Sequence, residues 1–280
     1  VAAQDGVEPV SGSDGISVIN ADVTDPDIQV FATPYGSSKV NDRLAVIGSN
    51  FHGTHGRVFF LRQARAIVVD NTIDGGSPGQ IGVEMANGYN FRTVHFPHSI
   101  IARNTIKGPG AMDDNIQLRS GQENLSPRTN NDFIVISDNE LESLFPREAI
   151  IRGCQGSTCT DSNVGSSVDL ENVIIENNHA TIKTGGRIGI ATFAWMQGGD
   201  ITVRDNSVDA TAPGITFQTT SPQFFAHVRD SLKPNAVDGV YNHDRINVFD
   251  NTFEGPGTRR VIWFAPAVGT GHEERGNVSK

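Results

Sequence analysis

The sequence predicts an all-β solenoid, in which short strands from successive coils stack as parallel sheets. Three observations lead to this prediction. One phrase recurs along the chain, as "VVDNTIDGG" (68–76), "IARNTIKGPG" (101–110) and "VFDNTFEGPG" (248–257). The 280 residues include 30 Gly and 13 Pro, which indicate frequent turns. Segments with the apolar period of a helix are scarce, so strands and turns account for most of the pattern.

An asparagine stands at the centre of each copy of the phrase. The six members are Asn71, Asn104, Asn139, Asn178, Asn206 and Asn251. Three positions earlier stands a β-branched residue that fits a buried strand, namely Val68, Ile101, Ile136, Ile175, Val203 and Val248. Two positions later stands an apolar residue, namely Ile73, Ile106, Leu141, Ala180, Val208 and Phe253. We predict that each asparagine takes the left-handed conformation of a tight bend and joins a hydrogen-bonded ladder.

A second strand follows each asparagine after a Gly/Pro turn. These strands are "IGVEM" (81–85), "NIQLRSG" (115–121), "EAIIRG" (148–153), "RIGIATF" (187–193), "GITFQTT" (214–220) and "VIWF" (261–264). Earlier copies of the unit lie at 44–62 and 15–31. One unit cannot bury its own apolar face, so neighbouring units must stack. A β-sandwich would instead require long alternating strands joined by two-residue turns, and the sequence lacks that pattern.

The repeat resembles that of right-handed parallel β-helix proteins of the pectate-lyase-like superfamily, over residues 15–265. This resemblance implies a single-stranded right-handed parallel β-helix of about seven to eight coils. It also implies one domain spanning 1–280, with irregular ends at 1–14 and 266–280. The fold does not by itself identify an activity.

Charge and cysteine content limit the partners and the compartment. The formal net charge of −10 argues against general binding to nucleic acids or anionic membranes. No apolar run approaches the roughly 20 residues of a membrane-spanning helix. Cys154 and Cys159 lie in "GCQGSTC", where they form either a local disulfide or two free thiols. A disulfide would indicate an oxidising compartment, so we expect a secreted or periplasmic protein.

The strand after each Gly/Pro turn is expected to carry the working face. Inward and outward residues alternate on a strand. On 187–193 this alternation places Ile188 and Ile190 inside and leaves Gly189 and Ala191 outside. The polar outward residues of these strands include Arg62, Glu84, Gln117, Arg119, Arg152 and Gln218.

Stacking is then expected to align four of these residues, Arg62, Glu84, Arg119 and Arg152, in one row. The segments 86–98, 120–132 and 219–244 follow the same strands, and long loops on a compact scaffold are often functional. We expect them to wall a groove whose floor is this row. The alternative is an ordinary solvated sheet face in which opposite charges are stacked.

Through the resemblance, the expected ligand is an acidic polysaccharide. A lyase removes the proton at C5 beside a uronate carboxylate, whose charge must first be neutralised by arginine or a metal. Arg119 and Arg152 suit that role, with Glu84 in the same row. The base remains open: lyases of this type use Arg or Lys, and His95 and His98 are substitutes. Glu148 adjoins the row, and with Arg62, Gln117, Gln218, His95 and His98 it completes the expected substrate-binding set.

Asp113 and Asp114 offer a second chemistry. "MDDNIQLRSG" resembles the paired-aspartate segment of polygalacturonase-like hydrolases, in which one Asp is the general acid and the other activates water. The preceding coil has no matching Asp and no Gly-His-Gly follows, so the pair equally suits a turn. Together with Glu84 and Glu148, these carboxylates are possible Ca²⁺ ligands, although no calcium-binding motif is present. The His pairs at 52–55 and 95–98 lack a third ligand, so no metal site is assigned.

Two classes of function follow from these features. The first is a polysaccharide lyase or related C5-epimerase acting on a uronic-acid polymer, with a polygalacturonase-like hydrolase as a variant. The second is a non-catalytic surface, adhesin or phage-tail-like module. The oligomeric state stays open, with a monomer favoured because no trimerisation segment is present.

Overall fold

The computed structural model describes twenty segments of the chain. They are residues 5–7, 15–24, 29–32, 43–52, 57–61, 65–74, 80–86, 98–107, 112–120, 129–143, 151–155, 168–183, 189–194, 197–212, 223–229, 231–232, 240–241, 243–255, 259–264 and 270–280. Side chains are described in 15–24, 43–52, 65–74, 98–107, 115–116, 133–142, 171–183, 199–212, 244–255 and 270–280.

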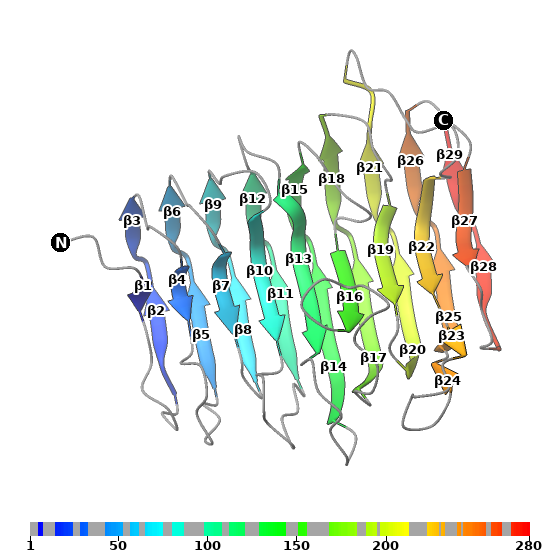
Figure 1. Ribbon diagram of the computed structural model, residues 1–280. Helices are drawn as coiled ribbons and strands as arrows, with labels where there is room; N and C mark the ends of the chain where they lie inside the picture. Colours follow the sequence, from blue (N-terminus) through cyan, green and yellow to red (C-terminus); the bar gives the residue numbers. More distant parts are fainter. Residues whose placement is uncertain are drawn as a thin grey trace.

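The described segments form three parallel nine-stranded sheets, which the chain visits in turn (Figure 1). Sheet 1 contains β1 (Asp5–Val7), β4 (Gln29–Ala32), β7 (Arg57–Leu61), β10 (Gln80–Ala86), β13 (Met112–Ser120), β16 (Ile151–Gln155), β19 (Gly189–Ala194), β22 (Gln223–Arg229) and β27 (Arg259–Phe264). Sheet 2 contains β2 (Ser17–Ile19), β5 (Leu44–Ile47), β8 (Ala66–Val69), β11 (Ser99–Ala102), β14 (Thr129–Ser137), β17 (Val168–Glu176), β20 (Gln197–Arg204), β25 (His243–Phe249) and β28 (Glu273–Arg275). Sheet 3 contains β3 (Asp22–Thr24), β6 (Asn50–His52), β9 (Thr72–Asp74), β12 (Thr105–Lys107), β15 (Glu140–Ser143), β18 (His179–Ile182), β21 (Ser207–Asp209), β26 (Thr252–Glu254) and β29 (Val278–Ser279).

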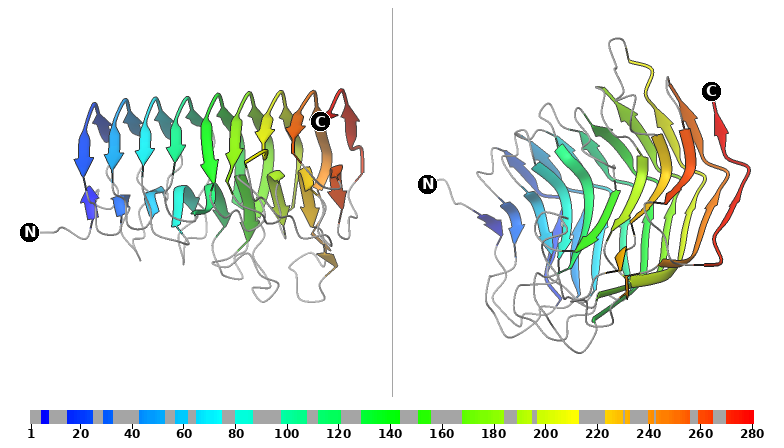
Figure 2. Two further views of the ribbon diagram at one scale, coloured as in Figure 1. Left: turned by 90° about the horizontal axis from the view of Figure 1, so that it is seen from above. Right: turned by 45° about the vertical axis from the view of Figure 1, so that its right-hand side comes forward.

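The predicted all-β architecture of stacked parallel strands is confirmed. Every coil supplies one strand to each sheet, and the coils follow one another from one end of the stack to the other (Figure 2). The only antiparallel pair among the described strands joins β23 (Ser231–Leu232) to β24 (Val240–Tyr241). Nine strands per sheet exceed the seven to eight coils expected from the sequence. The ends expected to be irregular contain strands, since β1 lies within 1–14 and both β28 and β29 lie within 266–280.

Sheets 2 and 3 bury the two apolar columns that the sequence predicts. In sheet 2 the register aligns Val68, Ile101, Ile136, Ile175, Val203 and Val248, and all of them are fully buried. In sheet 3 it aligns Ile73, Ile106, Leu141, Ala180, Val208 and Phe253, which are also buried. The described core therefore consists of side chains stacked on their equivalents in neighbouring coils.

The bend between sheets 2 and 3 differs from the prediction in one respect. The left-handed residue is the one immediately before each asparagine, with φ between 53° and 60°: these residues are Asp70, Arg103, Asp138, Asn177, Asp205 and Asp250. All six are exposed, whereas the asparagines that follow are buried. The asparagine thus turns inward, and its exposed polar neighbour takes the strained conformation.

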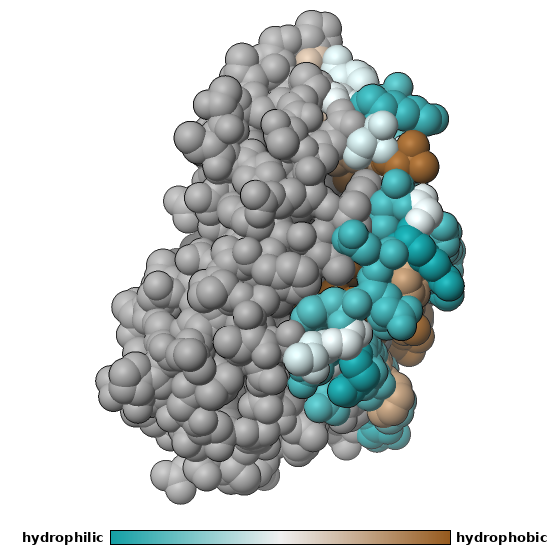
Figure 3. Space-filling model, turned by 90° about the vertical axis from the view of Figure 1, so that its right-hand side faces the viewer, coloured by the Kyte–Doolittle hydropathy of each residue, from teal (hydrophilic) through white to brown (hydrophobic). Residues whose placement is uncertain are grey.

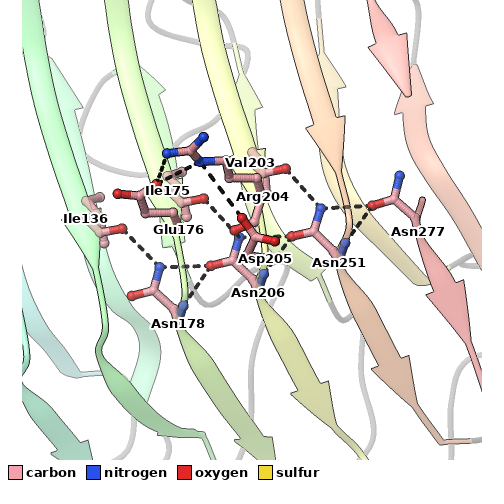
Figure 4. Close-up of polar contacts among 10 residues, drawn as sticks. All are labelled: Ile136, Ile175, Glu176, Asn178, Val203, Arg204, Asp205, Asn206, Asn251 and Asn277. Carbon is pink, nitrogen blue, oxygen red and sulfur yellow. Dashed lines mark hydrogen bonds and ion pairs between the residues drawn. The ribbon is translucent and has the colours of Figure 1, made fainter. Parts of the chain in front are cut away.

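The predicted asparagine ladder is confirmed and extends further than expected. Asn206 accepts at Oδ1 from Nδ2 of Asn178 at 2.9 Å and from the Asn178 backbone N–H at 3.0 Å. Its own Nδ2 donates to Asn251 and to the Ile175 carbonyl, both at 2.9 Å (Figure 4). The same pattern runs from Asn71 to Asn277, a member that the sequence did not reveal. The buried amides are therefore satisfied by one another and by strand carbonyls.

Candidate functional site

Six of the predicted site residues lie on strands of sheet 1, and the register of these strands shows which of the six share a row. Glu84 on β10 is the Cα partner of Gln117 on β13, and Gln117 is the partner of Arg152 on β16. The row continues through Thr192, His227 and Trp263 on β19, β22 and β27. This row, here called the Glu84–Trp263 row, is a line of six polar or aromatic residues. Its neighbouring members lie about 4.8 Å apart, which is the spacing of adjacent strands.

Arg119 does not belong to that row, contrary to the sequence-based expectation. Its Cα partners are Ala86 on β10 and Cys154 on β16. It lies two residues beyond Gln117, so it occupies the same face of the sheet in a second row. That second row continues to Arg229 on β22, through Ala194. The two arginines Arg119 and Arg152 are therefore diagonal neighbours, about 7–8 Å apart at Cα.

The sequence-based assignment of inward and outward residues on β19 was wrong. Ala191 is the Cα partner of Ile151, and Ile151 is the partner of the fully buried Ile116. The register therefore aligns Ala191, not Ile190, with the core row. Apolar residues occur at both phases of this strand, so alternation alone could not decide between them.

The sheet 1 strand of the next coil was also misplaced. The prediction put it at 214–220 and left 219–244 as a loop, but β22 is Gln223–Arg229. His227 and Arg229 consequently lie on the sheet in register with the rest of the site. The signal that could have found them is the alternating apolar run "QFFAHVR" itself.

The aspartate pair lies at a register irregularity. Gln80 pairs with Met112 while the next residue, Ile81, pairs with Asp114, so Asp113 is the extra residue of a bulge on β13. The neighbouring Asn115 is fully buried, and its Nδ2 donates to the Glu142 carbonyl at 3.0 Å. Its Oδ1 has no hydrogen-bond partner within the part of the chain that the structure describes. Bulges change the direction of side chains at the edges of sheets. Next to this bulge, the hydrogen bond of Asn115 holds the first half of β13 against the Glu142 carbonyl.

Four expected substrate-binding residues, Arg62, His95, Glu148 and Gln218, lie outside the described residues. The side chains of Glu84, Asp113, Asp114, Gln117, Arg119 and Arg152 lie outside the described side chains, so only their register positions are known. His98 is described: it is exposed, has φ of 60°, and stacks on Phe133 with ring centroids 5.1 Å apart. It directly precedes β11 of sheet 2.

Ion pairs join side chains of neighbouring coils. Arg245 donates to Asp200 through Nε and Nη2, both at 2.7 Å, and Arg103 binds Asp70 in the same bidentate manner. Hydrogen bonding to these guanidinium groups lowers the pKa of Asp200 and of Asp70 below that of a free aspartate. No cluster of three metal-ligating side chains occurs within the described residues. Among the same residues, no helix has the length and apolarity needed to cross a membrane.

Comparison with known proteins gave no assignment, since no protein-family model, curated protein or solved structure matches the chain. The candidate site therefore rests on the chain's own residues and their register.

Proposed function

We propose that this chain is a right-handed parallel β-helix that binds an anionic, uronic-acid polysaccharide along sheet 1 and acts on it as a lyase or a related C5-epimerase. The observation that supports this proposal is the alignment of Glu84, Gln117, Arg152 and His227 in one row of sheet 1. A linear polymer has a repeating array of carboxylates and hydroxyls, which suits a row of charged and amide side chains at regular spacing. A secreted or periplasmic location fits such a substrate.

Under this proposal three members of the row, Arg152, His227 and Trp263, have distinct roles. Arg152, with Arg119 diagonal to it, would neutralise the uronate carboxylate and make the C5 proton acidic. His227 becomes a candidate base, because an imidazole changes its protonation state near neutral pH. Trp263, the last member of the row, would stack on a sugar ring.

The lyase reaction is an elimination. The base removes the proton from C5, the C4–O bond to the neighbouring sugar breaks, and a C4=C5 double bond forms. The leaving oxygen takes a proton. An epimerase would return a proton to C5 from the opposite side instead, without cleaving the chain.

The test is incubation of the chain with a panel of uronic-acid polymers, with and without Ca²⁺, while the ultraviolet absorbance of unsaturated chain ends is followed. A lyase raises this absorbance. A hydrolase raises reducing ends without it, and an epimerase exchanges the C5 hydrogen with solvent. Arg152→Ala should abolish the product signal, whereas Arg204→Ala, an exposed arginine of sheet 2, should leave it unchanged.

The competing function is a non-catalytic binding, adhesin or phage-tail-like module. It predicts no product from any polymer. It also predicts that Arg119→Ala and Arg152→Ala leave polymer binding unchanged, because both arginines would then be ordinary solvated side chains. Absence of both product and binding would overturn the polysaccharide proposal.

A further inference from the structure

Arg229 is a second basic residue on the strand that carries the candidate base. It lies two residues after His227 on β22, so the two residues share one face of sheet 1. Their Cα atoms are about 7 Å apart, since a strand rises by about 3.3 Å per residue. His227 belongs to the Glu84–Trp263 row, whereas Arg229 lies in the second row with Arg119. Arg229 has no part in the elimination described above.

The register places no carboxylate beside Arg229. Its Cα partner on β19 is Ala194, and the diagonal position on that strand is Thr192. On the other side β27 ends at Phe264, which is the partner of Val228. None of these described strand positions carries an acidic residue that would neutralise a guanidinium group.

Arginines on sheet 2 are placed differently. Hydrophilic residues make up much of the described surface when the molecule is viewed from its C-terminal end (Figure 3). On sheet 2, Arg204 binds Glu176 and Arg245 binds Asp200, in each case across one step between coils. A carboxylate on the neighbouring strand therefore accompanies each of these two arginines. The corresponding neighbour of Arg229 is an alanine, so a carboxylate of a ligand has room to take that place.

Small residues separate Arg229 from the arginine on β16. Thr192 and Ala194 share this face of β19, and they stand between Arg152 on β16 and the pair His227 and Arg229 on β22. Arg152 and His227 are each about 4.8 Å from Thr192 at Cα, which is one strand spacing. A sugar that lies over Thr192 is therefore one strand from the arginine that neutralises its carboxylate and one strand from the base.

The next sugar of the polymer then lies over β22. A 1,4-linked pyranose is about as long as the spacing of adjacent strands, so a polymer that follows the Glu84–Trp263 row advances by about one strand per sugar. Successive sugars of an extended 1,4-linked chain face alternate sides. The carboxylate of the next sugar is therefore displaced to one side of the row, and Arg229 occupies the second row at this strand.

We propose that Arg229 binds the carboxylate of the sugar adjacent to the reacting one, and that the chain therefore selects polymers with contiguous uronates. This inference rests on the proposed polysaccharide function and adds a specificity to it. A planar guanidinium group binds a carboxylate through two parallel hydrogen bonds, and a neutral sugar offers no such partner. A polymer in which uronates alternate with neutral sugars presents no carboxylate to Arg229 and should bind more weakly.

Calorimetric titration with two hexasaccharides tests the proposal. One consists of contiguous 1,4-linked uronates, and in the other uronates alternate with neutral sugars. Total charge alone also favours the contiguous hexasaccharide, so the Arg229→Gln variant decides. It should bind the contiguous hexasaccharide roughly tenfold or more weakly than the unmodified chain, which is the effect of losing a hydrogen bond between charged groups. Its affinity for the alternating hexasaccharide should be unchanged.

Two further variants serve as controls. Arg229→Lys keeps the charge without the two parallel hydrogen bonds, so its affinity for the contiguous hexasaccharide should lie between those of the unmodified chain and Arg229→Gln. Arg204→Gln removes an exposed arginine of sheet 2 and should leave both affinities unchanged. In the lyase assay, Arg229→Gln should raise KM and leave kcat nearly unchanged, because its contact is with the neighbouring sugar in the ground state and the transition state alike.

The outcomes separate this inference from the function on which it rests. Circular dichroism establishes that each variant is folded. If Arg229→Gln weakens binding of both hexasaccharides equally, or of neither, the role of Arg229 is overturned and the polysaccharide function stands. If the unmodified chain binds neither hexasaccharide, both proposals are overturned.

Discussion

Arg103 binds Asp70 of the preceding coil through two parallel hydrogen bonds, Nε to Oδ1 at 2.7 Å and Nη2 to Oδ2 at 2.8 Å. Both residues occupy the left-handed position immediately before a ladder asparagine. The pair therefore links two successive bends on the surface, as Arg245 and Asp200 link two left-handed residues that lie inside β25 and β20 of sheet 2.

The Asp70–Arg103 pair predicts a specific pH dependence. Arg103→Asn should raise the pKa of Asp70 toward about 4, the value of a free aspartate. Asparagine is chosen because it tolerates the left-handed backbone at this position. Carboxyl titration by NMR measures the change, and the pKa of Asp200, which is bound to Arg245, should not move.

The sign of the stability effect follows from linkage. The pKa of Asp70 is lowered in the folded chain, chiefly by the hydrogen bond from Arg103, so the pair stabilises the fold above about pH 4. That stabilisation is lost as the pH falls through the lowered pKa. Unfolding by urea should therefore show a small difference between the original chain and Arg103→Asn at neutral pH, and no difference in strong acid. A difference that persists or grows in acid would contradict this account.

The left-handed backbone before each ladder asparagine can be tested at Asp138, which is exposed and has φ of 55°. Asp138→Gly should leave the free energy of unfolding nearly unchanged, because glycine adopts this conformation readily. Asp138→Val should lower it by about 1–2 kcal/mol, because a β-branched side chain is strained there. Denaturant unfolding measures both. Equal effects from Gly and Val would show that the aspartate side chain matters more than the backbone.

The ladder predicts a large and position-dependent effect. Asn139→Ala leaves the Asn104 backbone N–H and the Ile101 carbonyl without their buried partners. Each such group costs about 1–3 kcal/mol, so the free energy of unfolding should fall by roughly 3 kcal/mol or more. Asn277→Ala, at the half-buried end of the ladder, should cost less. Comparable losses at both positions would contradict the ladder as the source of stability.

Engineered disulfides test the register of sheet 1. In a background without Cys154 and Cys159, Gln117→Cys with Arg152→Cys should oxidise to a disulfide, because Cα partners on adjacent strands lie within bonding range. Arg119→Cys with Arg152→Cys should not, since their Cα atoms are about 7–8 Å apart. Gel mobility with and without reductant distinguishes the two. The opposite result would restore Arg119 to the row of Arg152.

The sequence predicts sheets 2 and 3 well because one repeated phrase contains both buried columns. Residues such as Ile136 and Leu141 are large and apolar, and the polar turn between them leaves only one phase for each strand. The sequence-based prediction failed on β19 because "RIGIATF" has apolar residues at both alternating sets of positions. The neighbouring strands therefore decide which set faces the core. The prediction missed Asn277 because Glu274 replaces the β-branched residue three positions earlier. Arg119 was assigned to the wrong row for a related reason: alternation gives the face of a residue but not its partner on the next strand.

The ladder also has a direction. Each asparagine carbonyl accepts from the preceding coil and each side-chain NH₂ donates to the following one, from Asn71 to Asn277. The amide dipoles therefore point the same way along the stack, and each bond polarises the next, as in a chain of cooperative hydrogen bonds. The ladder of buried amides is thus polar from one end of the stack to the other.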